Sequence, residues 1–223
     1  MDEPSLPAAE HHAALDGLAR INHLSRSARI LWPHIRRLAV EDRSRPLRVL
    51  DVASGAGDVA VALAKQAEKA GLPVHIVGID ISPIAVEHAR RRATAAGAAV
   101  DFEVHDALAA PLCQQFDVVM SSLFLHHLSR ASAVKLLAYM AHTAERAVLV
   151  NDLRRSRAGY LAAQAACRLA TRSPIVHVDG PRSVAAAFTL DEVRTIAAEA
   201  GLEGATIHRR WPFRFLLAWR RQM

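Results

Sequence analysis

The sequence is poor in cysteine and in lysine. It has two cysteines, Cys113 and Cys167, and three lysines among 223 residues. The two thiols form neither a CxxC pair nor a zinc-ligand spacing, which argues against a disulfide-stapled domain and against a zinc module. A reducing, cytoplasmic setting fits this usage best, and the nucleus and organelles stay open.

Long apolar runs are also missing. Arg, His, Asp or Gly interrupts each run before it reaches the roughly 20 residues that a membrane span needs. The first residues, MDEPSLPAAEHH, are acidic and lack the basic-then-apolar order of a secretory signal. We therefore expect no membrane span and no secretory leader.

The charge is unbalanced but dispersed. The formal net charge is +6, and nearly all of the positive charge is arginine because lysine is so scarce. The arginines are spread along the chain instead of forming one basic block. An ordinary basic surface is therefore the preferred interpretation, and nucleic acid as substrate is the disfavoured alternative.

From residue 46 onward, short β-branched runs alternate with helical stretches. The expected strands cover 48–53, 74–79, 100–105, 116–121 and 146–151. The expected helices cover 58–70, 83–96 and 129–142. This order implies an α/β domain with a parallel sheet covered on both faces, whose ligands bind at the carboxyl ends of the strands.

The flanking segments carry helix signals. Residues 10–40 place apolar side chains at helical spacing. Pro33 is expected to open a second helix there, because proline is tolerated in a first turn but not in mid-helix. Further on, Thr189 followed three residues later by Glu192 predicts a capping box at a helix start.

The organisation that follows is one main domain with additions. A helical cap is expected at 1–45 and the main domain at 46–223, with an Arg- and Ala-rich insertion at 152–188. Two final strands, near 204–210 and 213–219, are expected to form a closing hairpin.

The strongest motif is VLDVASGAGDVAVALA at 49–64, a strand followed by a glycine-containing turn and a helix. Gly55 and Gly57 allow the backbone to come close to a ligand. Asp80 ends the second strand, where a carboxylate can accept hydrogen bonds from both ribose hydroxyls of an adenosine cofactor. Asp106 ends the third strand and can accept a hydrogen bond from an adenine amino group.

These elements, together with FDVVMSSLFLHHL after them, resemble the class I S-adenosylmethionine (AdoMet) dependent methyltransferases over about 46–223. The resemblance implies a Rossmann-like seven-stranded sheet, mostly parallel with the last strand antiparallel, and AdoMet as the cofactor. It places the glycine turn against the methionine part, the second acidic residue on the ribose and the third on the adenine. The cofactor-binding residues implied are Asp51, Ala53, Ser54, Gly55, Gly57, Asp80, Ile81, Asp106, Ala107 and Ser121.

Two features bear on this resemblance. Ala53 stands where the family commonly has its first glycine. An alanine there narrows the turn slightly, and related quinone methyltransferases tolerate it. A nicotinamide or flavin domain is the alternative, but it predicts GxGxxG and no acidic residue at the end of the first strand. Asp51 precedes the turn here, and its carboxylate would repel a pyrophosphate and attract the sulfonium and ammonium of AdoMet.

The acceptor site is expected after the fourth and fifth strands. Methyl transfer is an in-line displacement, and a hydroxyl acceptor must lose a proton. His126 and His127 are the candidate bases because imidazole titrates near neutral pH. The alternative is that one of them caps the following helix. Asp152 is expected to orient a phenol or to act as a base.

A metal site is not expected. Asn151 and Asp152 stand where catechol-type O-methyltransferases have two magnesium ligands. The position of the third ligand holds Met120 or Ser121, so the oxygen cage that magnesium prefers is incomplete.

The segment LARINHLSRSARILW resembles the start of menaquinone and ubiquinone methyltransferases, with Asn22, Ser25 and Trp32 in matching places. The resemblance implies that the cap folds over the cofactor, with Arg20 or Arg29 reaching the AdoMet carboxylate. The alternative is a helix that simply packs on the core.

Residues 152–188 resemble the lids of bacterial methyltransferases of phenolic and polyketide products. In this lid, His177 and Asp179 form a candidate base with its orienter, and an ordinary surface loop is the alternative. The expected apolar wall of the acceptor pocket consists of Leu123, Phe124, Leu161 and Phe188.

The expected acceptor is a small molecule. Amino-directed nucleic-acid methyltransferases carry an Asp/Asn-Pro-Pro-aromatic motif after the fourth strand, where this chain has SSLF. Three functions stay open: O-methylation of a phenolic or polyketide-like hydroxyl, C-methylation of a quinone-type ring, and non-catalytic AdoMet binding to a partner protein. A homodimer is compatible with the sequence, which leaves the oligomeric state open.

Overall fold

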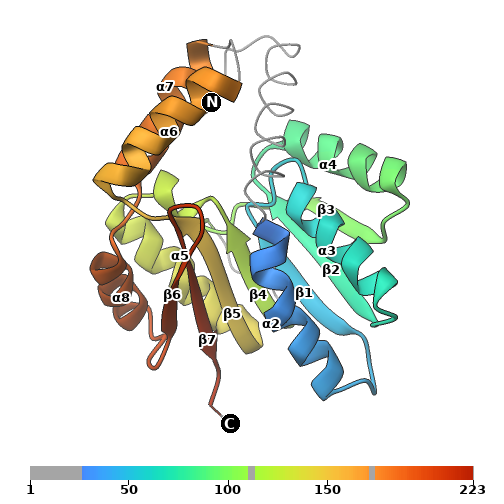
Figure 1. Cartoon of the computed structure of the whole chain (residues 1–223). Coiled ribbons are helices and arrows are strands. Elements are labelled where there is room, and N and C mark those ends of the chain that lie inside the picture. Colours follow the sequence, from blue (N-terminus) through green and yellow to red (C-terminus); the bar gives the residue numbers. More distant parts are fainter. Residues whose placement is uncertain (1–26, 110–113, 171–173, 223) are drawn as a thin grey trace.

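A computed structural model describes residues 27–109, 114–170 and 174–222 of the chain. A single sheet crosses the molecule, with helices on both of its faces (Figure 1). The strands are β1 (Leu47–Val52), β2 (Val74–Asp80), β3 (Val100–Val104), β4 (Phe116–Ser122), β5 (Ala144–Leu153), β6 (Thr206–Arg210) and β7 (Arg214–Arg220).

The order across the sheet is β3-β2-β1-β4-β5-β7-β6. The pairs from β3 through β5 are parallel, whereas β7 runs antiparallel to both β5 and β6. The predicted Rossmann-like seven-stranded sheet with an antiparallel last strand is therefore confirmed. The chain order reverses between β1 and β4, so the carboxyl ends of these two strands form the switch point at which such sheets bind ligands.

Two helical layers cover the sheet. The helices are α2 (Ser27–Glu41), α3 (Asp58–Lys69), α4 (Pro83–Ala96), the 3-10 turn η1 (Leu125–His127), α5 (Arg130–Thr143), α6 (Arg157–Ala170), α7 (Pro174–Ala186) and α8 (Leu190–Glu199). One apolar cluster joins α2, α3 and α4 to one face of the sheet, and a second joins α5 and α8 to the other face. In Figure 1, α6 and α7 lie beyond the carboxyl end of β5, on the side away from the C-terminus.

The predicted helix start at Pro33 is wrong. Pro33 lies inside α2, which runs without a break from Ser27 to Glu41. Its ring costs one backbone hydrogen bond, but the helix buries Leu31, Ile35 and Leu38 in a single stripe against the core. Burial of this stripe outweighs the lost hydrogen bond.

The fifth strand is longer than expected. It begins at Ala144, where that residue pairs with Phe116 of β4, and it ends at Leu153. Asp152 therefore belongs to the sheet and is almost fully buried. The segment beyond it forms α6 and α7.

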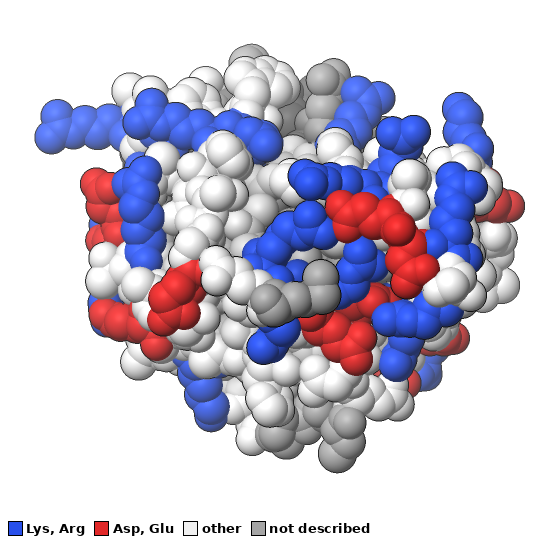
Figure 2. Space-filling view, turned by 90° about the horizontal axis from the view of Figure 1, so that it is seen from below, with Lys and Arg blue, Asp and Glu red and all other residues white. Residues whose placement is uncertain are grey.

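The edge of the sheet opposite the switch point carries interspersed charges. Figure 2 shows this face from below, with basic and acidic side chains side by side. Glu41, at the end of α2, binds Arg37, Arg146 and Arg220 at 3.1, 3.0 and 2.6 Å. Positive charge on this face is thus shared with carboxylates instead of forming one patch. No helix among the described residues is both long and apolar enough to cross a membrane.

A substitution on α2 tests whether this helix is part of the core. We expect Ile35→Ala to lower the free energy of unfolding by about 2–4 kcal/mol, because Ile35 of α2 is fully buried in the apolar cluster that joins α2 and α3 to the sheet. Urea unfolding followed by circular dichroism measures the change. Arg36→Ala, at the exposed next position, is the control and should change stability little. Equal stability of the two variants would mean that α2 is not packed on the sheet.

Candidate cofactor and acceptor site

The glycine turn after β1 has a left-handed backbone at three positions. The φ angles are 56° at Ala53, 54° at Gly55 and 73° at Gly57. Ala53, where the family commonly has glycine, therefore adopts a conformation that costs a residue with a Cβ about 1 kcal/mol or more. The turn keeps its shape in spite of this substitution.

The two glycines of the turn serve different purposes. A Cβ at Gly55 would meet no atom within 4 Å, so this position faces open space that a ligand can occupy. A Cβ at Gly57 would lie 2.6 Å from the ring of Phe102 and 2.8 Å from the Cβ of Ala89. Gly57 is therefore required by the packing of the turn against β3 and α4.

Asp80 connects the second strand to this turn. One carboxylate oxygen accepts a hydrogen bond from the backbone N–H of Gly55 at 2.8 Å, and the other accepts from the N–H of Ser82 at 2.9 Å. Each oxygen retains a second lone pair, so the carboxylate still has capacity for two hydroxyl donors. Ile81, the next residue, is 66% exposed and offers an apolar surface beside it.

Asp106 lies in line with these residues, just beyond β3. Its carboxylate accepts a hydrogen bond from the N–H of Leu108 at 2.8 Å, which fixes the turn that follows the strand. Ala107 and Leu108 pack against the apolar cluster on the α5 side. Because β3, β2 and β1 are neighbours, Asp106, Asp80 and the glycine turn all lie along one edge of the sheet.

The floor of the switch point holds buried polar groups. Ser54, after β1, and Ser121, in β4, each have a buried hydroxyl with no hydrogen-bond partner among the described residues. A buried polar atom usually has a partner, so these two hydroxyls fit the edge of a polar ligand. The residues present at this edge thus fit AdoMet: open backbone at Gly55, a free lone pair on each Asp80 oxygen, and two hydroxyls that no described residue pairs with.

Asp51 is the most strongly perturbed acid of the site. It is almost fully buried at the end of β1, and burial raises its pKa well above the ordinary value; the nearby carboxylates of Asp58 and Asp80 raise it further. A cationic ligand beside Asp51 would favour its ionised form. The electrostatics of the turn therefore suit a positively charged molecule.

The pKa of Asp51 predicts a pH dependence of stability. The unfolded chain loses this proton near pH 4, whereas the folded chain retains it to higher pH. The free energy of unfolding should therefore fall as pH rises above about 4, until Asp51 ionises in the folded state. Asp51→Asn should lack this component and should gain stability relative to wild type as pH rises.

Urea unfolding of the ligand-free protein between pH 4 and 8 measures this difference. Glu103→Gln, which removes an exposed carboxylate on β3, is the control. Parallel stability curves for wild type and Asp51→Asn would show that Asp51 is not held protonated.

His126 and Asp152 are brought together by the fold. The Nδ1 atom of His126 lies 2.6 Å from a carboxylate oxygen of Asp152, and both side chains are nearly inaccessible. The backbone N–H of Leu153 also donates to Asp152, which fixes the carboxylate. His127 is exposed, and its ring centroid lies 4.1 Å from that of His126.

The neighbouring Asn151 faces the opposite side of the sheet. Its amide nitrogen donates to the hydroxyl of Ser122 at 3.0 Å, and its buried oxygen has no partner among the described residues. Asn151 and Asp152 therefore point away from each other, because successive strand residues alternate between faces.

A buried arginine at this edge was missed by the sequence analysis. Arg214, the first residue of β7, is 3% exposed and donates to the hydroxyl of Ser27 at 2.8 Å. Burial lowers its pKa to about 10, against the opposing pull of Asp152 and Asp58. The available signal was a charged residue at the start of the apolar strand RFLLAW, but the sequence analysis assigned this segment only to a hairpin.

Other expected residues are less informative. Phe124 and Phe188 pack against the apolar cluster on the α5 side, whereas Leu161 is 62% exposed on α6. Arg29 is exposed on α2. Arg20, Asn22 and Ser25, and the side chains of His177 and Asp179, lie outside what the structure describes.

Comparison with known proteins agrees with this geometry. A family model described as a methyltransferase domain matches residues 49–146, from β1 to the start of β5. The chain thus contains a methyltransferase domain over these residues. The demethylmenaquinone methyltransferase of Thermus thermophilus is 41% identical over 90 residues, which is 40% of this chain and 38% of that relative. The matched segment thus spans well under half the length of the curated relative.

Two solved structures share the methyltransferase fold. The plantazolicin methyltransferase BpumL, solved in complex with SAH, has a TM-score of 0.70 and 14% identity, covering 96% of this chain and 90% of that one. Human N-acetylserotonin methyltransferase, solved with SAM, has a TM-score of 0.68 and 16% identity, covering 97% of this chain and 57% of that one. At these identities the similarity concerns the fold.

Proposed function

We propose that the chain transfers the methyl group of AdoMet to a small-molecule acceptor, and that the acceptor atom is a phenolic or polyketide-like hydroxyl oxygen. The observation that carries the choice of a hydroxyl is the buried His126–Asp152 pair beyond the end of β4. Deprotonation of a hydroxyl needs a base with a fixed orientation, and this pair provides one.

The chemistry of the pair follows from its hydrogen bond. If the Nδ1–H of His126 is donated to Asp152, the lone pair lies on Nε2, the atom that accepts the proton of the acceptor hydroxyl. Asp152 then stabilises the imidazolium that forms and holds the ring in place. AdoMet supplies the electrophilic methyl group, and the residues along the β1–β3 edge position it.

The cofactor-binding roles rest on the same edge. We propose that Asp80 binds the ribose and Ile81 packs on the adenine, while Asp106 and Ala107 border the adenine on its other side. Asp51, Ala53, Ser54, Gly55, Gly57 and Ser121 would surround the methionine part. The exposed Ile81, the open space at Gly55 and the unpaired hydroxyls of Ser54 and Ser121 support this arrangement.

C-methylation of a quinone-type ring is the second candidate. It is favoured by the similarity of residues in this domain to the demethylmenaquinone methyltransferase of Thermus thermophilus. Both candidates need the same cofactor site and differ in the atom that receives the methyl group. Mass spectrometry and NMR of the product distinguish an O–CH3 from a C–CH3 group.

The cofactor is tested by isothermal titration with AdoMet and, separately, with NAD. Wild type should bind AdoMet and not NAD, and Asp80→Ala should weaken AdoMet binding by at least about tenfold because the ribose loses its acceptor. Asp101→Ala, which removes an exposed carboxylate from β3, should bind like wild type. Preferential binding of NAD would overturn the proposed function.

The proposed base is tested once an acceptor has been found by screening phenols and quinols. His126→Gln should lower kcat by about 100- to 10,000-fold while AdoMet affinity is retained, because only proton removal is lost. Asp152→Asn should lower kcat, since the ring loses the acceptor that orients it. His142→Gln, exposed on α5, is the control. Unchanged kcat in His126→Gln would remove the base from the mechanism.

A further inference from the structure

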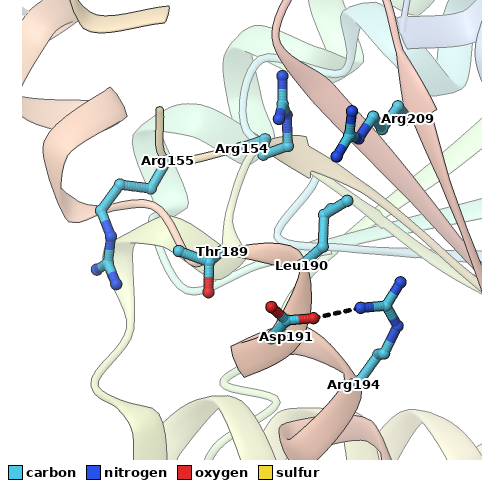
Figure 3. Close-up of a pocket in the computed structure, with 7 residues that line it drawn as sticks. All are labelled: Arg154, Arg155, Thr189, Leu190, Asp191, Arg194 and Arg209. Atoms are coloured by element: carbon cyan, nitrogen blue, oxygen red, sulfur yellow. Dashed lines mark hydrogen bonds and ion pairs between the residues drawn. The ribbon is translucent and has the colours of Figure 1, made fainter. Parts of the chain in front are cut away.

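A polar pocket lies between the end of β5, the start of α8 and strand β6. It has a volume of about 230 Å³ and is shown in Figure 3. It is lined by Arg154, Arg155, Thr189, Leu190, Asp191, Arg194 and Arg209, which we call the arginine pocket. The lining comes from the segment after β5, the start of α8 and strand β6.

Two of its four arginines are neutralised locally. Arg194 pairs with Asp191, the interaction drawn in Figure 3, and Arg155 pairs with Glu192 at 2.5 Å. Glu192 also forms the capping box with Thr189. The two carboxylates at the start of α8, Asp191 and Glu192, are thus already paired with Arg194 and Arg155.

The other two arginines have no acidic partner within the described parts of the chain. Neither Arg154 nor Arg209 forms an ion pair there, and the Nε atom of Arg154 is buried without a hydrogen-bond partner. Like charges that line one pocket repel each other, so an anion between them would relieve the repulsion. The pocket therefore has an excess of positive charge and unused donors.

The register of the sheet places this pocket on the same side as the proposed base. Asp152 of β5 lies opposite Phe215 of β7, which in turn lies opposite Arg209 of β6. Phe215 and the β5 residue Val150 belong to the apolar cluster on the α8 side, so this row faces α8. Two strand spacings separate Asp152 from Arg209, which is about 10 Å.

We propose that the arginine pocket binds an oxyanion, a carboxylate or a phosphate, carried by the methyl acceptor. Guanidinium groups bind such groups through paired N–H donors, which Arg154 and Arg209 have available. The pocket lies about 10 Å across the sheet from Asp152, the partner of His126, so an acceptor whose hydroxyl lies at His126 can reach it with an acidic arm. The proposal rests on the proposed function and adds a substrate class to it.

The pocket is tested first with inorganic phosphate, which requires no methyl transfer. Isothermal titration at constant ionic strength should give saturable binding to wild type, and Arg209→Gln and Arg154→Gln should each weaken it at least tenfold. Arg209 is exposed, so its substitution should leave the fold intact, which thermal unfolding checks. Arg36→Gln removes the same charge from exposed α2 and should bind like wild type. No saturable binding, or equal binding by all variants, overturns the proposal.

A second titration asks whether the anion belongs to the acceptor. Protein saturated with S-adenosylhomocysteine is titrated with 3,4-dihydroxybenzoate and with its neutral analogue 3,4-dihydroxybenzyl alcohol. The acid should bind at least tenfold more tightly, phosphate should compete with it, and Arg209→Gln should remove the preference.

The two titrations separate the possible failures. If phosphate binds but the acid and the alcohol bind equally or not at all, the pocket is a separate anion site and the assignment to the acceptor is overturned. Failure to bind AdoMet would instead overturn the proposed function, whatever the outcome with phosphate.

Discussion

The structure depends on one topological constraint, the reversal of strand order between β1 and β4. Strands β1 to β3 extend the sheet in one direction, and β4 begins its extension in the other. The connections after β1 and β4 therefore leave on opposite faces of the sheet. All the parallel strands end at this edge, which is why Asp80, Ser121 and the glycine turn lie close together although they are far apart in the chain.

The same edge carries charge that a folded core usually avoids. Asp51, Asp152 and Arg214 are almost fully buried, and each lies within electrostatic range of another ionisable group. Buried charge is costly, and such groups gather at functional sites more often than in purely structural cores. Asp152 is linked to His126 on one face of the sheet, and Arg214 is linked to Ser27 on the other. The edge therefore carries one buried polar pair on each face of the sheet, with β5 and β7 between them.

Much of this was predictable from the sequence because it is local. The β-branched runs and the capping box at Thr189 specify their own conformations over a few residues, and the strands and helix start that they predicted are confirmed. Pro33 was misread because the proline was given more weight than the apolar stripe on either side of it, although the helical spacing of that stripe was visible in the sequence. Here the packing of the apolar stripe against the core overrides the local preference of Pro33.

The rest could not be predicted because it depends on register between distant segments. The contact between His126 and Asp152 joins residues 26 positions apart, and the row from Asp152 to Arg209 crosses three strands. Arg154 and Arg209 look like ordinary surface residues in the sequence. Only the antiparallel pairing of β7 with both neighbours brings them to one pocket.

The difference between Gly55 and Gly57 has a consequence for how this domain changes over time. A side chain at Gly57 would clash with the ring of Phe102, so a substitution there damages folding whether or not the protein binds a ligand. Gly55 faces open space, so selection on its lack of a side chain ends when ligand binding ends, apart from the strain of its backbone angle. In a descendant that had lost its cofactor, Gly57 would stay under strong constraint from packing, whereas Gly55 would be constrained only by its backbone angle. Glycine at position 55 is therefore better evidence of retained ligand binding than glycine at position 57, which the fold itself requires.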